Sequence, residues 1–307
     1  MKPLKIAIAG VGKIVYDQHL PAIRGNQDFE LVATASRNHT VDGVPAFKGI
    51  QEMLSSQRDI DAVSLCMPPQ YRYEAARLAI RAGKSVFLEK PPGATLSEIE
   101  SLKKLAAEYA VTLFASWHSR HAPAVQVVKS HLNEHPPRRV KVIWREDVRH
   151  WHPDQEWIWQ PGGLGVFDPG INALSIVTEI LPEEIFLRTA ALEFPSNRQA
   201  PIGAQLSFTD ATGTDVHADF DWRQTGEQTW DILIDTDSTH LHLKKGGHEL
   251  WIDAVRRDLP LEGEYPSLYR HFADLIRGRS SDVDVAPLRH VADAFMLGQH
   301  VVTDPFI

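Results

Sequence analysis

Cysteine is almost absent from this chain of 307 residues, since Cys66 is the only one. An intrachain disulfide and a cysteine-rich zinc site are therefore excluded, and a metal would need histidines and carboxylates. Long hydrophobic runs are also missing. No window approaches the roughly eighteen uninterrupted apolar residues of a membrane-spanning helix, and no signal-peptide core opens the chain. We therefore expect a cytoplasmic protein that does not bind a membrane.

Positive charge is scarce as well. The chain has 32 Lys and Arg against 40 Asp and Glu, a net charge of -8, and no run of basic residues long enough to form a stripe on the surface. A nucleic-acid binder usually carries such a stripe, so nucleic acids are not expected partners. The length is sufficient for two domains, each with its own hydrophobic core.

The N-terminal part alternates between short apolar runs and segments with helical spacing. The expected strands cover 5–9, 31–36, 62–66, 85–88 and 111–115, and the expected helices cover 18–24, 50–56, 71–82 and 96–109. Strands and helices that alternate at this length are typical of a parallel, doubly wound sheet with right-handed crossovers. The pattern predicts an α/β fold, with a dinucleotide-binding Rossmann domain over 1–120.

The pattern changes after about residue 121. Val140, Val142 and Trp144 alternate, and a strand that carries Glu146 is expected over 142–148. A helix is expected over 169–180, and 186–255 reads mainly as successive strands. Two further helices, over 266–277 and 287–301, are expected to close the chain. Successive strands favour a large, mostly antiparallel open sheet, so 121–307 is predicted to form an α+β substrate-binding domain.

A glycine turn, Gly10-Val11-Gly12-Lys13-Ile14-Val15, follows the first strand. Two glycines permit a tight turn and the close approach of a pyrophosphate to a helix N-terminus, although Val15 replaces the usual third glycine. Such a turn can be purely structural, but its place after the first strand of a βα pattern favours a nicotinamide cofactor. Gly10, Gly12, Lys13 and Ile14 are the candidate contacts.

The end of the second strand carries Ser36 and Arg37, where a site that prefers NAD usually has an acidic residue. A hydroxyl and a guanidinium suit a 2′-phosphate, so NADP is predicted to be accepted beside NAD, or preferred to it. The alternative is that Arg37 is a solvated surface charge.

The fourth strand ends in Glu89-Lys90-Pro91. Ligands bind at the carboxyl ends of parallel strands, so Lys90 is a candidate for proton transfer beside the cofactor. A surface turn is the alternative.

The segment Gly162-Gly163-Leu164-Gly165-Val166-Phe167-Asp168-Pro169-Gly170-Ile171-Asn172 places a carboxylate and an amide four residues apart at a helix start. If both lie on one helix, they share a face. An amide cannot act as a base at neutral pH, so proton transfer is assigned to Lys90 or Asp168, and Asn172 is expected to bind substrate hydroxyls. The alternative for Asp168 is a helix N-cap.

In this order and spacing, the glycine turn, Glu89-Lys90-Pro91 and the segment from Gly162 to Asn172 resemble the glucose-fructose oxidoreductase and inositol dehydrogenase family over almost the whole chain. The stretches 90–95, 117–120 and 157–175 are most similar to its bacterial aldose 1-dehydrogenases, which act on L-arabinose or D-galactose. The resemblance implies NAD(P)-dependent oxidation of L-arabinose, D-galactose or D-fucose at C1 to the lactone, as the first step of non-phosphorylative sugar breakdown. No metal is implied. The family usually has histidine at the position of Asn172, and the asparagine here is one reason to favour an aldose substrate.

The resemblance also implies further site residues. Cys66, Pro68, Pro69 and Glu89 would contact the cofactor, and His118, Glu146, Trp151, His152 and Trp230 would contact the sugar. The alternatives without a role in binding are a solvated strand charge for Glu146, core packing for the tryptophans and a structural role for His118. Some family members associate through the open face of the C-terminal sheet, which predicts a homo-oligomer, while others are monomers. Rival functions are another sugar or inositol dehydrogenase and a non-catalytic NADP-binding sensor.

Overall fold

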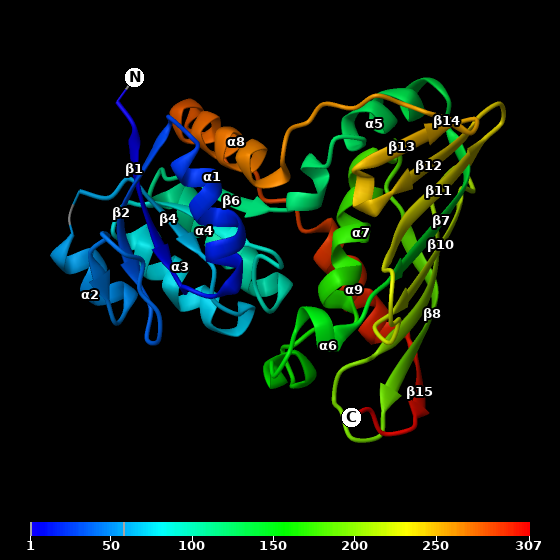
Figure 1. The fold of residues 1–307 in the computed structure, drawn as a ribbon, viewed down its shortest axis with the longest axis horizontal. Coiled ribbons are helices and arrows are strands. Elements are labelled where there is room, and N and C mark those ends of the chain that lie inside the picture. The colour runs from blue at the N-terminus through cyan, green and yellow to red at the C-terminus, as the bar shows by residue number, and fades with distance from the viewer. Residues whose placement is uncertain (1, 58) are drawn as a thin grey trace. The chain divides into compact units, whose positions relative to one another are not determined.

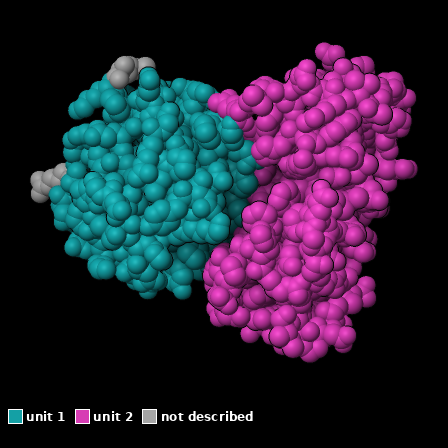
Figure 2. Space-filling view, in the orientation of Figure 1, with its two compact units in different colours: residues 1–118, 263–285 teal, residues 119–262, 286–307 magenta. Residues whose placement is uncertain are grey.

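The computed structural model describes residues 2–57 and 59–307, which divide into two compact units. Unit 1 consists of Met1–His118 and Gly263–Val285, and unit 2 of Ser119–Glu262 and Ala286–Ile307 (Figure 2). The sequence predicted a division at residue 120, close to the first boundary. It assigned all of 121–307 to the second domain, however, whereas the structure places Gly263–Val285 in unit 1.

The sheet of unit 1 is parallel and has six strands in the order β3-β2-β1-β4-β5-β6. Its strands are β1 (Leu4–Ala9), β2 (Phe29–Ala35), β3 (Ala46–Phe47), β4 (Ala62–Leu65), β5 (Ser85–Glu89) and β6 (Leu113–Ser116). This order is that of a Rossmann fold, which confirms the predicted fold class. Because the strand order reverses between β1 and β4, the carboxyl ends of these two strands form the expected ligand-binding edge.

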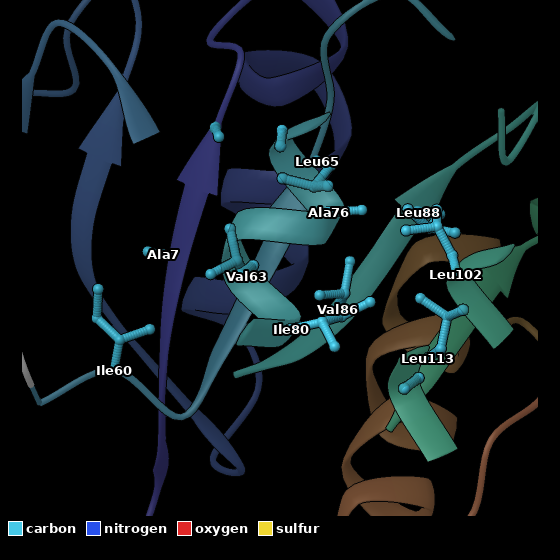
Figure 3. Packing of buried hydrophobic residues seen from close by; sticks show 14 of the residues in the cluster. Ala7, Ile60, Val63, Leu65, Ala76, Ile80, Val86, Leu88, Leu102 and Leu113 are labelled. Carbon is cyan, nitrogen blue, oxygen red and sulfur yellow. The ribbon is translucent and has the colours of Figure 1, made fainter. Parts of the chain in front are cut away.

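Helices cover both faces of this sheet. They are η1 (Val15–His19), α1 (Leu20–Arg24), α2 (Ile50–Ser56), η2 (Pro69–Tyr71), α3 (Arg72–Arg81), α4 (Leu96–Glu108) and α8 (Glu264–Gly278), while η3 (His118–His121) crosses the boundary to unit 2. On one face, side chains of the strands pack against α3 and α4 (Figure 3). Labelled members of this cluster are Ala7, Val63, Leu65, Ala76, Ile80, Val86, Leu88 and Leu102.

The other face of the sheet explains why α8 belongs to unit 1. Ile6, Ile8 and Phe87 point to this face, where α1 and α8 cover them. The contribution of α8 is Tyr265, Leu268, Tyr269 and Phe272, all buried. Strands buried on both faces need helices on both sides, and the second cover comes from a segment far along the chain.

Unit 2 contains a nine-stranded sheet in the order β14-β13-β12-β11-β7-β10-β9-β8-β15. The strands are β7 (Pro137–Arg145), β8 (Phe186–Pro195), β9 (Gly203–Thr209), β10 (Asp215–Asp221), β11 (Thr229–Thr236), β12 (His240–Lys244), β13 (Glu249–Ile252), β14 (Val255–Arg256) and β15 (Gln299–Thr303). The pairings are antiparallel except β7 with β10 and β8 with β15. The predicted mostly antiparallel sheet is therefore confirmed.

The helical elements of unit 2 are α5 (Val125–Glu134), α6 (Val148–Trp151), η4 (Glu156–Trp159), α7 (Phe167–Ile180), η5 (Lys245–Gly247) and α9 (Ala286–Leu297). Figure 1 shows α7 and α9 alongside the sheet. α7 contacts β7, α5 and α9, and most of its residues are buried. A helix that is apolar nearly all round needs such cover on every side.

Two predicted boundaries are wrong in unit 2. The helix expected over 287–301 ends at Leu297, and Gln299–Thr303 forms the edge strand β15 beside β8. The strand expected over 142–148 ends at Arg145, so Glu146 follows the strand instead of lying on it. Among the described residues, no helix is long and apolar enough to cross a lipid bilayer.

Candidate active site

The two glycines of the turn after β1 are subject to different structural constraints. Gly10 has a φ of +87°, and a Cβ there would lie 2.5 Å from the Met67 backbone nitrogen, so only glycine fits. Gly12 has no such constraint: a Cβ there would meet nothing within 4 Å, and its φ lies outside the left-handed region. Gly10 therefore lets β1 and β4 approach each other, whereas Gly12 leaves open space above the turn.

The rest of the turn presents side chains to solvent. Lys13 forms an ion pair with Asp17, and Ile14 is exposed. Val15, at the position of the missing third glycine, is fully buried and begins the ten-residue helical segment of η1 and α1. The valine thus packs in the core, while the open turn precedes the helix.

The ends of β2 and β4 supply the other predicted cofactor contacts. Ser36 and Arg37 follow β2, and the Arg37 side chain is exposed while its carbonyl accepts a hydrogen bond from Lys48 Nζ at 3.3 Å. Cys66 and Pro68 follow β4, and Pro69 begins η2. The open space over Gly12 and the exposed guanidinium fit a nicotinamide dinucleotide, including one with a 2′-phosphate.

The carboxylate of Glu89 is buried and bound within unit 1, and a contact of Glu89 with the cofactor stays a prediction. Oε1 accepts hydrogen bonds from Tyr265 Oη at 2.8 Å and His19 Nε2 at 3.1 Å, and Oε2 accepts one from the Lys90 backbone N–H at 2.8 Å. Glu89 lies two residues after Phe87 on β5, so both side chains point to the face that α8 covers.

Charge on Glu89 is stabilised by its partners. Burial alone would raise the pKa of Glu89, but the hydrogen bond and charge of His19 outweigh burial and lower it to about 2. Burial alone would lower the pKa of His19, yet the adjacent Cys66, Tyr269 and Glu89 raise it well above its ordinary value. The two residues therefore form a buried ion pair.

Lys90 follows this pair at the carboxyl end of β5. Its backbone N–H is bound by Glu89, and the peptide bond from Lys90 to Pro91 is cis. Because Lys90 directly follows the carboxyl end of β5, it lies at the ligand-binding edge of the sheet, as the sequence predicted. Its role in proton transfer stays a prediction.

His118, just after β6, is half-buried and tied to α8. Its Nδ1 lies 2.6 Å from Glu264 Oε2, and its ring stacks on Tyr265 with centroids 5.6 Å apart. These contacts give His118 a structural role in unit 1, and a sugar contact stays a prediction.

In unit 2, glycines set the loop that leads into α7. A Cβ on Gly163 would lie 2.4 Å from the Trp157 carbonyl oxygen, and a Cβ on Gly165 would lie 2.3 Å from the Pro201 carbonyl oxygen. Both positions therefore require glycine. The loop can pass this close to its neighbours only with these residues, and it delivers Asp168 to the first turn of the helix.

Asp168 is not the N-cap of α7. The N-cap is Val166, no side chain caps the helix, and Asp168 lies one residue inside its first position. The carboxylate of Asp168 instead faces His152, with Oδ2 3.1 Å from His152 Nε2. His152 Nδ1 lies 3.3 Å from Gln155 Oε1. The structure thus pairs two residues that the sequence placed in the same site.

Asn172 lies one helical turn after Asp168, on the same face of α7. It is half-buried, and its backbone carbonyl accepts a hydrogen bond from Ser175 Oγ at 2.7 Å. Within the described residues its side-chain amide makes no hydrogen bond. The amide is therefore available to a ligand.

Glu146 is the centre of an aromatic cluster. Its two carboxylate oxygens each accept a hydrogen bond at 3.0 Å from an indole N–H, one from Trp222 and one from Trp230. Burial raises the pKa of Glu146, and the charge of Asp168 adds to the rise while the two indole bonds oppose it. Glu146 therefore lies near Asp168 and holds two tryptophan rings in place.

The rings around Glu146 form two pairs, which its carboxylate joins. Trp230 packs on the exposed Trp151 with centroids 5.6 Å apart, and Trp222 packs on His152 at 5.3 Å. Unit 2 thus brings together Glu146, Trp151, His152, Asp168, Asn172 and Trp230, all six of which the sequence selected. Flat aromatic faces beside carboxylates and an amide suit a sugar ring, whose C–H face is apolar and whose rim is polar.

Several residues of these sites were missed. In unit 2 they are Trp222 and Gln155, which contact Glu146 and His152. In unit 1 they are Arg72, His19 and Tyr265, which surround Glu89. Nothing in their local sequence distinguishes them. All except Gln155 act on a residue distant in the chain, whereas Gln155 contacts His152 three residues before it.

Comparison with known proteins identifies the family. Residues 4–116 match the model of the oxidoreductase family with an NAD-binding Rossmann fold, which includes glucose-fructose oxidoreductase and inositol dehydrogenase. Galactose 1-dehydrogenase of Pseudomonas fluorescens is 44% identical over 306 residues, covering 100% of this chain and 99% of the relative. The chain belongs to this family. It is therefore an NAD(P)-dependent oxidoreductase, as the sequence predicted.

Solved structures agree with this assignment. D-galactose-1-dehydrogenase from Rhizobium etli has a TM-score of 0.96 and 61% sequence identity, covering 100% of this chain and 99% of its own. A 3-ketoreductase from Actinomadura kijaniata, solved in complex with NADP, has a TM-score of 0.85 at 21% identity, covering 98% of this chain and 99% of its own, and so shares the fold.

Proposed function

We propose that the protein is an aldose 1-dehydrogenase that uses NADP or NAD and oxidises D-galactose, L-arabinose and D-fucose at C1 to the lactone. The observation that carries this proposal is the group at the start of α7. A buried carboxylate, Asp168, pairs with His152, and an available amide, Asn172, follows one turn later. The full-length relatives named for galactose oxidation support the substrate class.

Oxidation of a sugar at C1 removes a proton from the anomeric hydroxyl and a hydride from the carbon. Bound NAD(P)+ would supply the hydride acceptor. Lys90 and Asp168 are the two candidate bases for the proton. The imidazole of His152 would hold the carboxylate of Asp168 in one orientation, which favours a role in either positioning the hydroxyl or accepting its proton.

The proposal that the protein accepts NADP is based on the residues that follow β2. Arg37 is exposed after β2 and no acidic side chain accompanies it there, so a 2′-phosphate would meet a guanidinium instead of a carboxylate. We propose that NADP is the preferred cofactor.

Steady-state kinetics on a panel of aldoses, with NAD+ and NADP+ side by side and with detection of the lactone, test the proposal. Turnover of D-galactose, L-arabinose and D-fucose with lactone formation is expected. A keto product without lactone would indicate an inositol or keto-sugar dehydrogenase instead. NADP binding without turnover of any aldose would favour the non-catalytic sensor.

The proton-transfer assignment needs separate variants. Lys90→Ala and Asp168→Ala should each lower kcat by about 100-fold or more, the range of general acid–base catalysis, with little effect on the Kd for NADP. Lys104→Ala and Asp154→Asn, at exposed positions of unit 1 and unit 2, are the matched controls. A double variant of Lys90 and Asp168 with near-wild-type kcat would exclude this assignment.

Association of two copies through the sheet of unit 2 stays a prediction.

A further inference from the structure

Arg72 is an almost fully buried arginine near the candidate cofactor site. It is the first residue of α3 and is only 2% exposed. Its guanidinium donates hydrogen bonds to three backbone carbonyls, those of Met67, Glu89 and Pro91. A buried cation is costly unless its donors are satisfied, so a position that keeps one calls for an explanation.

The three carbonyls belong to the ligand-binding edge of the sheet. Met67 follows β4, where the backbone passes against Gly10. Glu89 and Pro91 are the residues immediately before and after Lys90. A single planar group therefore ties the carboxyl end of β4 to both sides of Lys90. Arginine can do this because its five N–H donors lie in one rigid plane, whereas the lysine ammonium is a single point.

A second contact fixes Lys90 from another direction. Its backbone N–H donates to Glu89 Oε2 at 2.8 Å, and the other oxygen of Glu89 is held by Tyr265 and His19. The peptide group before Lys90 and the carbonyl of Pro91 after it are thus bound by buried side chains. These bonds anchor the main chain immediately before Lys90 and one residue after it.

We propose that Arg72 is a positioning residue for Lys90: by binding the carbonyls of Glu89 and Pro91 it fixes the point from which the lysine side chain reaches the reacting hydroxyl. This inference rests on the proposed function, in which Lys90 takes part in proton transfer. Arg72 is 2% exposed and its guanidinium binds backbone carbonyls, so no direct contact with substrate or cofactor is expected. Its loss should therefore lower kcat, since a misplacement of about 1 Å can cost about 100-fold in rate, while the KM for the sugar and the Kd for NADP change little.

The experiment compares Arg72→Ala and Arg72→Lys with the control Arg77→Ala. Arg77 lies on the same helix but pairs with Glu74 at the surface. Kinetics with the best sugar, fluorescence titration of NADP and thermal unfolding are measured for each. We expect kcat to fall about 10- to 100-fold in Arg72→Ala and less in Arg72→Lys, with the Kd for NADP within about threefold of wild type and no change in Arg77→Ala.

Chemical rescue separates positioning from a general effect on folding. Guanidinium ion at millimolar concentration should restore part of the lost kcat in Arg72→Ala, and should restore none in Lys90→Ala. If Arg72→Ala does not fold, kcat and the Kd for NADP are compared in Arg72→Lys instead, because this variant keeps a buried cation.

The possible failures are distinguishable. A wild-type protein that turns over no sugar contradicts the proposed function. An active wild type with unchanged kcat in the Arg72 variants overturns the positioning role. A fall in kcat that is matched by an equal weakening of NADP binding, without rescue by guanidinium, also overturns it and leaves Arg72 a purely structural residue.

Discussion

Gly10 and Gly12 provide a matched pair of substitutions that separates folding from cofactor binding. Both lie in the turn after β1 and both lack a side chain. A Cβ on Gly10 would overlap the backbone of Met67 and would sit on a residue with a φ of +87°, while a Cβ on Gly12 would meet open space. Gly10→Ala should therefore damage the fold, and Gly12→Ala should damage cofactor binding alone.

The magnitudes follow from these two environments. An alanine held at a positive φ costs about 1–3 kcal/mol, and overpacking against a fixed backbone costs a further 1–3 or so, which together approach the whole stability of a marginal domain. At Gly12 the added methyl group should be neutral, or stabilising by up to about 1 kcal/mol through the unfolded chain. A pyrophosphate displaced from the turn would lose at least one hydrogen bond to a charged group, about 1.5–3 kcal/mol, which is about 10- to 100-fold in Kd.

Thermal unfolding with and without NADP measures both effects in one assay. At a cofactor concentration of 100 times the Kd, binding stabilises the wild type by about 2.7 kcal/mol. A 100-fold weaker Kd in Gly12→Ala would leave only about 0.4 kcal/mol of that stabilisation at the same concentration. The apo Tm of Gly12→Ala should match wild type, and that of Gly10→Ala should fall.

Two results would refute this reasoning. Wild-type affinity for NADP in Gly12→Ala would show that the pyrophosphate does not lie over the turn. A Gly10→Ala variant as stable as wild type would show that β1 and β4 do not need the close approach that the structure describes.

Three further predictions concern other parts of the two sites. Arg37→Ala should weaken NADP binding about tenfold or more and leave NAD unaffected, because a charge-assisted bond to the 2′-phosphate is lost; a strong NAD preference in both wild type and variant, by the ratio of kcat/KM values, would contradict it. Asn172→Ala should reduce the discrimination between L-arabinose and its C4 epimer D-xylose, because the amide can pair with the hydroxyl of one epimer only, and equal losses in kcat/KM for the two sugars would count against this role. The third prediction concerns pH. In the fold, burial would raise the pKa of Glu89, but His19 lowers it to about 2. The ionised form of Glu89 therefore stabilises the fold fully above about pH 4.5, and this stabilisation is lost as the pH falls toward 2. Glu89→Gln should lack this component, so the wild-type Tm should fall more steeply than that of the variant between pH 4.5 and about 2.5, and parallel curves would exclude it.

The sequence predicted well those parts of the fold that depend on the local pattern of apolar residues. The alternation of apolar strands and helices in the N-terminal part is visible within windows of ten residues, and it fixed the parallel sheet and the edge at which Gly10, Cys66 and Lys90 lie. The spacing of four between Asp168 and Asn172 likewise needed only the knowledge that a helix begins there. In these cases the neighbours that matter are close in the chain.

Most of the missed features depend on partners that are far away in the chain. The alternation on β5 shows that Glu89 shares a face with Phe87, but not that Tyr265 of α8 covers this face. Residues 299–303 look like the continuation of a helix, and become a strand because β8 offers an open edge for pairing. A local pattern records which side of an element is buried and says nothing of what buries it.

The two candidate bases are held in place by opposite means, and this determines how each site responds to substitution. Lys90 follows a strand whose end is bound by large buried side chains, Arg72 and Glu89, so its position depends on groups that can be exchanged one at a time. Asp168 follows a loop that is close to its neighbours because Gly163 and Gly165 have no side chains, and neither glycine can be exchanged without moving the backbone. Variants behind Lys90 can therefore separate catalysis from folding, whereas near Asp168 such a separation has to come from its side-chain partner His152.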